Sequence, residues 1–229
     1  MPPKSYFSHE LFDFLDQLRE NNTREWFLAN KSRYERHVRE PCLSFVADFE
    51  PYLSAVSRHL VADPRPSGGS LFRIYRDVRF SRDKSPFKTM AALHFRHEAG
   101  RDVHAPGFYL HLEPANVFAG SGIWHPDAET LAKIRRAIAG GAGDWKRAIS
   151  GKVYRRTCVF GGDSLKRPPL GYDQQHPLIE DLKRKDFVTM TNFSQEQVCA
   201  SDFIERYADL CQTTAPLMRL LTKAVGLPW

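Results

Sequence analysis

The spacing of apolar residues in this chain changes from helical to alternating at Leu71, and it becomes helical again at Pro126. Alternation of apolar and polar residues is typical of a strand that is buried on one face only. Because the alternating segments follow one another with short links, we expect them to pair as an antiparallel meander. The predicted strands are Leu71–Phe80, Met90–His97, Phe108–Pro114 and Asn116–Gly120. Their apolar face is expected to carry Phe72, Ile74, Val78 and Phe80 in the first, Leu93 and Phe95 in the second, and Phe108, Leu110 and Leu112 in the third, with His94 and Arg96, and Tyr109, His111 and Glu113, on the polar face.

Helical spacing of apolar residues marks both flanks of this region. Serine, threonine and proline stand where these segments begin, and all three are favourable in or just before the first turn of a helix. Helices before and after an antiparallel sheet predict an α+β fold, and the lack of a linker predicts one domain over residues 1–229. The predicted helices begin near Ser8, Thr23, Pro41, Pro126 and Ser194, with shorter helical pieces at Trp145 and Pro177–Lys185, a short strand at Phe187–Thr191 and an irregular stretch at Tyr154–Leu170.

The charge balance weakly favours anionic partners. The chain has 229 residues, with 33 Lys+Arg against 27 Asp+Glu, so its formal net charge is +6. This excess is well below that of a dedicated nucleic-acid binder, which carries dense basic tracts. No apolar stretch approaches the ~20 residues that a membrane span needs, so we expect no membrane partner.

Cysteine usage and the first residues of the chain indicate the compartment. The four cysteines, at positions 42, 158, 199 and 211, form no C-x-x-C pair and no zinc-site spacing. Isolated cysteines in a chain of this size favour a reducing environment. The first residues, MPPKSYFSHELFDFL, contain no long apolar run, so we expect neither a signal peptide nor an anchor. These observations predict a cytoplasmic protein.

The segment Leu71–Thr89 carries the densest positive charge in the predicted sheet. Six lysines and arginines stand against two acids, Asp77 and Asp83. A simple use for such charge on a rigid sheet is to hold an anion, because the planar fork of arginine donates two parallel hydrogen bonds to phosphate or carboxylate. The basic residues are Arg73, Arg76, Arg79, Arg82, Lys84 and Lys88.

The polar face of the predicted sheet is the candidate binding site. Histidine next to a carboxylate can act as a general base, so the candidate catalytic residues are His111, Glu113 and Asp77, with His94 on the same face. In the alternative interpretation, the arginines and aspartates link neighbouring strands as structural salt bridges. The candidate ligand-binding residues are Arg73, Tyr75, Arg79, Lys84, Lys88, Arg96, Tyr109 and Trp124.

Two loops are further candidate sites, and each has a structural alternative. The backbone N–H groups of Ser81–Pro86 could form an anion-binding nest, or the segment is a tight turn in which Asp83 and Ser85 bond the local backbone. The small residues of Gly120–Pro126 let a ligand approach the backbone before a helix begins, with Trp124 as a stacking wall. The alternative is a strand-to-helix turn with Trp124 in the core.

No metal centre is predicted. His111 and Glu113 would share one face of a strand, and His94 or His125 could complete a set of ligands. However, the sequence contains no H-E-x-x-H motif, and no histidine pair stands out on a predicted helix. The sequence also contains no motif that identifies a cofactor, so the cofactor is left unknown.

Four strings of residues together resemble one bacterial family. They are NNTREWFLANKSRYERHVREP, YRDVRFSRDKSPFKT, GFYLHLEP and FAGSGIWHP. From about Phe7 to the C-terminal helix the chain is similar to DUF2461, also called TIGR02453. The resemblance implies no particular chemistry, because that family has no established activity. In relatives the glycine-rich string resembles a run of three glycines, and Ser121 replaces the middle one here. This replacement argues against a strict need for glycine at that position.

Three functions fit these features. The first is binding, or binding and turnover, of a small phosphorylated or carboxylated ligand on the Arg/His-rich face of the sheet. The second is a nucleic-acid-associated protein that uses the basic segment at residues 71–89, and the third is a non-catalytic interaction module. A concave pocket would favour the first, and an extended basic stripe with exposed aromatic residues would favour the second. The sequence leaves open whether the protein is an enzyme.

Overall fold

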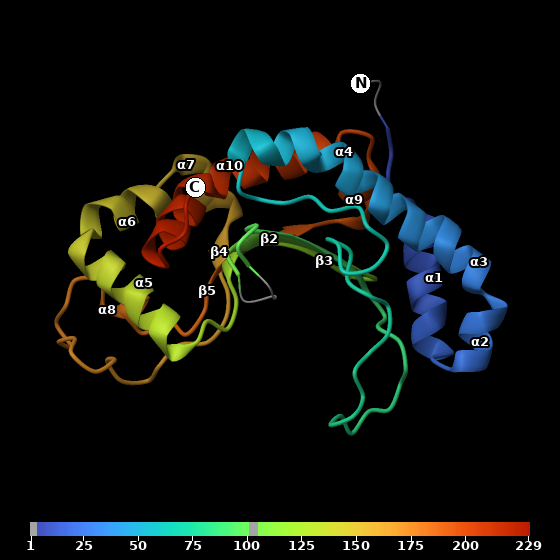
Figure 1. The fold of residues 1–229 in the computed structure, drawn as a ribbon, viewed down its shortest axis with the longest axis horizontal. Coiled ribbons are helices and arrows are strands. Elements are labelled where there is room, and N and C mark those ends of the chain that lie inside the picture. Colours follow the sequence, from blue (N-terminus) through green and yellow to red (C-terminus); the bar gives the residue numbers. More distant parts are fainter. Residues whose placement is uncertain (1–3, 101–104) are drawn as a thin grey trace.

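Five strands in the described part of the chain form one antiparallel sheet (Figure 1). The computed structural model describes residues 4–100 and 105–229. Helices precede and follow the sheet, so the predicted α+β fold is confirmed, and three of the four predicted strands form an antiparallel meander as β1, β2 and β3. From edge to edge, the strands are β1 (Ala91–Arg96), β2 (Gly107–Glu113), β3 (Asn116–Ile123), β5 (Phe187–Phe193) and β4 (Val159–Phe160).

The strand register gives the two faces of the sheet different characters. Leu93 of β1 pairs with Leu110 of β2, and both are fully buried on one face. In the next row His94 pairs with Tyr109, which pairs in turn with Gly120 of β3. Because neighbouring residues of a strand point to opposite sides, this second row lies on the other face. The predicted faces of β1 and β2 are therefore confirmed.

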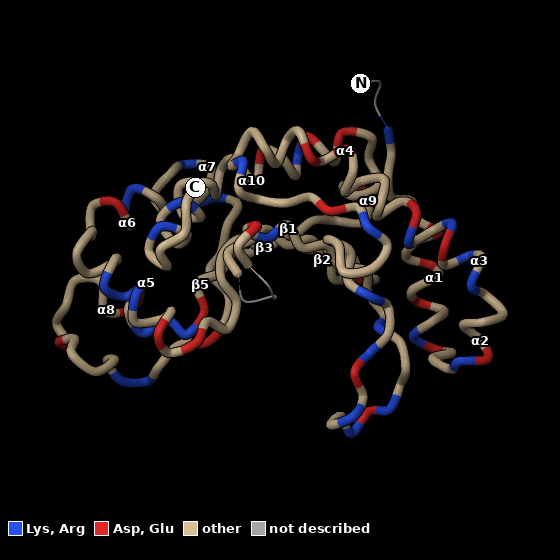
Figure 2. Tube along the Cα trace, viewed as in Figure 1, with Lys and Arg blue, Asp and Glu red and all other residues tan. Residues whose placement is uncertain are grey.

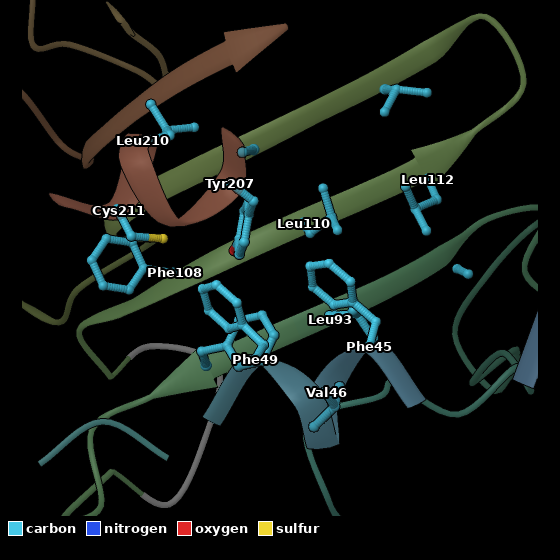
Figure 3. Packing of buried hydrophobic residues seen from close by; sticks show 14 of the residues in the cluster. Phe45, Val46, Phe49, Leu93, Phe108, Leu110, Leu112, Tyr207, Leu210 and Cys211 are labelled. Carbon is cyan, nitrogen blue, oxygen red and sulfur yellow. The ribbon is translucent and has the colours of Figure 1, made fainter. Parts of the chain in front are cut away.

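Helices α4 (Glu40–Val56) and α10 (Phe203–Ala224) cover the apolar face of the sheet (Figure 1). The ring of Phe95 in β1 lies between Phe49 of α4 and Tyr207 of α10, with ring centroids 4.9 Å and 6.0 Å away. All three rings are buried, and burial stabilises each phenylalanine by roughly 1.5–3 kcal/mol. Figure 3 shows the same layer at close range, with Phe49 and Tyr207 against the leucines of the sheet.

The N-terminal helices lie at one end of the sheet (Figure 1). Thr23 caps the second of them as expected, because its Oγ1 accepts a hydrogen bond from the Trp26 N–H at 3.2 Å. A π-helical turn precedes Pro41, whose missing N–H cannot take part in a regular helix, so Pro41 lies inside a longer helical stretch. The elements are α1 (His9–Glu20), α2 (Arg24–Ala29), α3 (Lys31–Tyr34) and η1 (Glu35–Arg39).

Most of the later helices lie at the opposite end of the sheet (Figure 1). The segment Tyr154–Leu170 was expected to be irregular, but it includes the end of one short helix and all of β4, which pairs with β5 over only two residues and is too short to show alternation. No helix in the described ranges has both the length and the apolar character required to cross a membrane. The helices at this end are α5 (Ala128–Gly140), α6 (Ala142–Ile149), α7 (Lys152–Thr157) and α8 (Ile179–Leu182), whereas α9 (Gln195–Cys199) lies near α4 (Figure 1).

The prediction of a strand at Leu71–Phe80 was wrong. Residues 71–90 form a long projecting loop, which we call the arm (Figure 1). Isolated bridges join Leu71 to Leu93 and Tyr75 to Phe87, and no continuous ladder runs along the arm. Phe80, which was expected on the core face of a strand, is 96 % exposed.

Both acidic residues of the arm are paired with arginines of the arm itself. Arg79 pairs with Asp77 at 2.7 Å, and Arg76 pairs with Asp83. Figure 2 shows the mixed positive and negative residues along this loop. Because exposed ion pairs of this kind need no neighbouring strand, the alternation reflects a solvated loop and not a sheet.

The base of the arm is held by the corner between α1 and α2. The side chain of Asn22 donates to the Phe87 carbonyl at 3.0 Å and accepts from the Phe87 N–H at 3.1 Å. The ring of Phe27 in α2 stacks on Phe87 with centroids 4.1 Å apart. These contacts fix the part of the arm that lies next to the sheet, while its tip extends into solvent.

Two glycines of β3 allow a matched test of this packing. A Cβ at Gly122, where φ is +141°, would lie 1.9 Å from the carbonyl oxygen of Phe187 in β5. We expect Gly122→Ala to lower the free energy of unfolding by about 1–3 kcal/mol or more, because the backbone angle disfavours a side chain and β5 leaves no space for one. Gly120→Ala should change it by less than about 1 kcal/mol, since a Cβ there makes only ordinary contacts, the nearest at 3.6 Å. Urea denaturation of both variants measures the difference, and equal losses would contradict this packing.

Candidate functional site

The sheet face opposite α4 and α10 contains a cleft of about 500 Å³. Tyr109 of β2, Gly120 of β3 and Met190 of β5 lie side by side on its floor. A Cβ at Gly120 would meet the Cβ of Tyr109 at 3.6 Å, so the backbone there could carry a larger residue. Glycine at this position therefore hollows the floor of the cleft.

Residues from outside the sheet form the walls of the cleft. The arm contributes Phe72, Lys88 and Met90, the loop after β3 contributes Trp124, and the loop after β4 contributes Gly162. Trp124 is 45 % exposed, so it is not the core residue that the structural alternative expected. Aromatic walls around a largely apolar floor are typical of sites that bind small molecules.

A chain of hydrogen bonds runs along the polar face of β2. The hydroxyl of Tyr109 lies 2.9 Å from Nδ1 of His111, and Nε2 of His111 lies 3.1 Å from the Glu113 carboxylate. Asn116 donates to the same carboxylate oxygen at 2.9 Å, and the His111 ring stacks on Phe118 with centroids 4.6 Å apart. The three residues share one face because they are spaced two apart in a strand.

Glu113 determines which groups donate and which accept in the hydrogen bonds of Tyr109, His111 and Glu113. Burial alone would raise the pKa of Glu113, but hydrogen bonds from Asn116 and His111 outweigh burial and lower it, so the carboxylate only accepts. Nε2 of His111 therefore donates, and in the neutral ring Nδ1 accepts from the Tyr109 hydroxyl. Burial, and then the charge of Glu113, raise the pKa of Tyr109 to about 12. The phenol thus keeps its proton, and its oxygen is an acceptor for a ligand.

Lys88 supplies positive charge to the cleft. It is the only lysine or arginine among the described residues that line it. Its ammonium group donates to the Arg73 carbonyl at 2.9 Å and lies 5.3 Å from the centre of the Phe72 ring. Burial, and then the charge of Arg73, lower the pKa of Lys88. An anion in the cleft would supply the opposite charge that this half-buried ammonium group lacks.

A buried carboxylate joins the two loops that form the far wall. Asp186 is 1 % exposed, and it accepts hydrogen bonds from the backbone N–H groups of His125 at 2.8 Å and Asp163 at 2.9 Å. These bonds help to hold His125 in the left-handed conformation, with φ +46°. Asp186 is therefore a positioning residue for the neighbouring wall residues Trp124 and Gly162.

The sequence that builds this cleft matches one protein family. Residues 10–220 match the family described as "Conserved hypothetical protein (DUF2461)". The chain belongs to the DUF2461 family. The matched range includes all five strands and both walls of the cleft. Comparison with curated proteins and with solved structures found no significant match.

The structure brings several predicted site residues of this DUF2461 chain together. Lys88, Tyr109, His111 and Trp124 line the cleft, and Glu113 bonds His111 beside it. These residues come from the arm, from β2 and from the loop after β3, so they converge only in the folded chain.

The other predicted residues lie outside the cleft. Arg73, Asp77, Arg79 and Lys84 are exposed on the arm, and Tyr75, 54 % exposed, packs beside the arm's base. In the turn at Ser81–Pro86, the N–H and the hydroxyl of Ser85 both donate to the Asp83 carboxylate, at 2.9 Å and 2.6 Å. These are the contacts that the tight-turn alternative expects. Arg96 lines a smaller cavity of about 160 Å³.

Sequence reasoning missed the apolar part of the cleft. Phe72 was assigned to the core face of a strand, whereas it lines the cleft with Phe118 and Met190. One signal was present in the sequence, since Phe118 and Gly120 alternate with the core residues of β3 and therefore share the polar face. An aromatic residue beside a glycine on that face indicates a hollow with an apolar lining.

The geometry gives no support for a metal centre in the described residues. No group of three or more histidine, cysteine, aspartate or glutamate side chains in residues 4–100 and 105–229 is placed to hold an ion. His111 is paired with Glu113 at 3.1 Å, and His125 with Asp186 at 3.3 Å, and the two pairs do not converge.

The lowered pKa of Glu113 predicts a pH-dependent contribution to stability. Its stabilising effect is fully present above the usual value of 4.5 and is lost as the pH falls through the lower folded value. At pH 7 we expect Glu113→Gln to lower the free energy of unfolding by about 1–3 kcal/mol. The difference in free energy of unfolding between this variant and wild type should narrow as the pH falls below 4.5.

Urea denaturation at pH 7 and at a pH below 4.5 measures this change. Glu25→Gln, at an exposed residue of α2, is the matched control and should show a small gap at both pH values. A Glu113→Gln gap that stays constant with pH would contradict the assigned interactions.

Proposed function

We propose that the cleft binds a small organic anion with an apolar body, and that the acidic group of this ligand lies against Lys88. The observation that carries the proposal is a half-buried lysine on the wall of an apolar cleft, with a carbonyl as its hydrogen-bond acceptor and no acidic partner in the described ranges. Burying an ammonium group without an opposite charge is costly, so an incoming anion stabilises it.

The size and lining of the cleft support an organic ligand over a bare inorganic ion. Its volume of about 500 Å³ falls in the roughly 300–1,000 Å³ range of small-molecule sites. Phe72, Phe118 and Trp124 provide aromatic surfaces, and Met90 and Met190 provide flexible side chains that adapt to a ligand.

The hydrogen-bond chain of β2 adds a preference for a ligand with a hydroxyl or amine group. The Tyr109 oxygen accepts such a donor, because its own proton is directed at His111. The chain also provides a route by which a proton from the donor reaches His111, where Glu113 stabilises the imidazolium ion. Turnover of a bound ligand is therefore chemically accessible at this site, although the proposal itself concerns binding.

One observation favours the alternative of nucleic-acid binding. Phe80 is fully exposed at the tip of the arm, and the Arg79 guanidinium lies 5.8 Å from the centre of its ring. However, Arg79 is already paired with Asp77, so a phosphate would have to displace that carboxylate. We rank this function below small-ligand binding for that reason.

The cytoplasm is the compartment that we propose for this protein. All four cysteines are free thiols, and three of them are buried. Free cysteines persist most readily in a reducing compartment, which supports the proposal.

Anilinonaphthalene sulfonate (ANS) tests the proposed ligand class, because it joins an aromatic body to a sulfonate. We expect saturable fluorescence with the folded protein. Lys88→Met should weaken the Kd about tenfold, the effect of losing one charge-assisted contact. Gly120→Leu should weaken it at least as much, because the new side chain would fill the floor of the cleft.

Two variants serve as matched controls for the ANS titration. Lys84→Met removes a charge from the exposed part of the arm, and Gly140→Leu adds the same side chain at the end of α5, where a Cβ would meet nothing within 4 Å. Both should bind ANS as wild type does. The neutral analogue phenylnaphthylamine should bind Lys88→Met with the wild-type affinity and Gly120→Leu more weakly. Equal weakening in the controls would contradict the proposed site.

Binding to generic DNA should be weak. At physiological salt we expect a Kd at best in the range of about 10⁻⁴–10⁻⁶ M, typical of nonspecific association through phosphates. Fluorescence anisotropy with single- and double-stranded DNA measures it. Submicromolar binding that is lost when Arg79, Arg82 and Lys84 are replaced would place the nucleic-acid function first.

A further inference from the structure

A second, polar cavity of about 450 Å³ lies between the end of α1 and the arm. Three cationic side chains reach its lining, namely Arg19, Arg76 and Lys88, against one acidic side chain, Asp83. The cavity therefore has a net positive charge and many hydrogen-bond donors. Amide and hydroxyl groups come from Asn22, Ser85 and Thr89.

The two arginines are held in this cavity by weak partners. Arg19 pairs with Asp16, one turn earlier on α1, and Arg76 pairs with Asp83. The side chains of both acids are about half exposed, at 48 % and 58 %. Exposed ion pairs contribute little to stability, so each guanidinium group can exchange its partner for a stronger anion in the cavity.

The polar cavity and the apolar cleft adjoin each other. Lys88 and Met90 of the arm contribute to the lining of both. The positive charge of Arg19 also helps to lower the pKa of Glu113. One ligand can therefore contact Lys88 from the cleft and extend toward Arg19 and Arg76.

We propose that the polar cavity is a phosphoryl-binding subsite and that the ligand of this protein is a phosphate ester or diphosphate of a small apolar or aromatic molecule. This inference rests on the proposed function, because it places the apolar body in the cleft and the phosphoryl group between Arg19, Arg76 and Lys88. It replaces the anion site expected at Arg73 and Arg79, which lie outside both cavities.

The donors in the cavity suit phosphoryl oxygens better than a carboxylate. A phosphoryl group carries up to two negative charges and three terminal oxygens, whereas a carboxylate offers one charge and two oxygens. Arg19 comes from α1, Arg76 from the outgoing half of the arm and Lys88 from the returning half, so the three cations reach the cavity from separate segments. Arginine forks match phosphate geometry, and Thr89 can add a hydroxyl donor.

Pyrophosphate and inorganic phosphate are the probes for the subsite. At constant ionic strength, pyrophosphate should raise the Tm of the wild-type protein, because it binds only the folded state. Calorimetric titration should show its Kd weakened by about tenfold or more in Arg19→Gln and in Arg76→Gln. Arg82→Gln, which removes the same charge from an exposed position of the arm outside the cavity, should bind as wild type does.

Phenyl phosphate tests whether one ligand spans the two cavities. It should bind more tightly than inorganic phosphate, and Gly120→Leu should remove that gain while it leaves the affinity for inorganic phosphate unchanged. Conservative Arg19→Lys, which keeps the charge but loses the fork, should restore part of the binding lost in Arg19→Gln.

The outcomes separate this inference from the proposed function. The subsite is refuted by a wild-type Tm that responds to pyrophosphate no more than to sodium chloride, or by equal affinity in all the arginine variants. If ANS still depends on Lys88 and Gly120 in that case, the proposed function stands without the subsite. In the converse outcome, pyrophosphate binding depends on Arg19 and Arg76 while ANS binding is unaffected by Gly120→Leu. That result would support an anion site in the polar cavity, and it would refute a ligand that spans the cavity and the cleft.

Discussion

The aromatic layer between the sheet and the helices α4 and α10 is the interaction on which the rest of the structure depends. Phe49, Phe95 and Tyr207 join one early helix, one strand and the last helix into a single buried contact. Because both long helices cover the same face, the opposite face of the sheet is left to the arm and to the loops after β3 and β4. Irregular segments cover a sheet less completely than helices do, and the cleft lies where they meet.

Glycine then determines the depth of that cleft. At Gly122 the chain is so close to β5 that a side chain is excluded, whereas Gly120 leaves out a side chain for which there is room. Ser121 between them points to the other face, where its hydroxyl lies 3.0 Å from that of Thr214 in α10. This explains why a residue other than glycine is accommodated at the middle position. The same three residues thus connect strand packing, helix packing and the open floor of the site.

Periodicity in the sequence predicts the parts of this structure that alternate between core and solvent. It identifies the two faces of β1 and β2, and it places Tyr109, His111 and Glu113 together because local spacing alone determines which face they share. It fails in the arm, where ion pairs such as Asp77–Arg79 imitate the polar face of a strand without a sheet. It also misses the long-range contacts at the two walls, such as Asn22 with Phe87, because nothing in local spacing encodes which distant segments meet.

The methionines provide the most direct measurement of where a ligand binds. Met90 and Met190 line the cleft from the arm and from β5, whereas Met218 is fully buried in α10 on the other side of the sheet. The protein can be labelled at its methionine methyl groups and titrated with ANS while methyl NMR spectra are recorded. The account predicts that the Met90 and Met190 signals shift together with one saturation curve, and that the Met218 signal stays in place. Saturable ANS binding that leaves Met90 and Met190 unshifted, or that moves Met218 as much as either of them, would contradict a ligand site in the cleft.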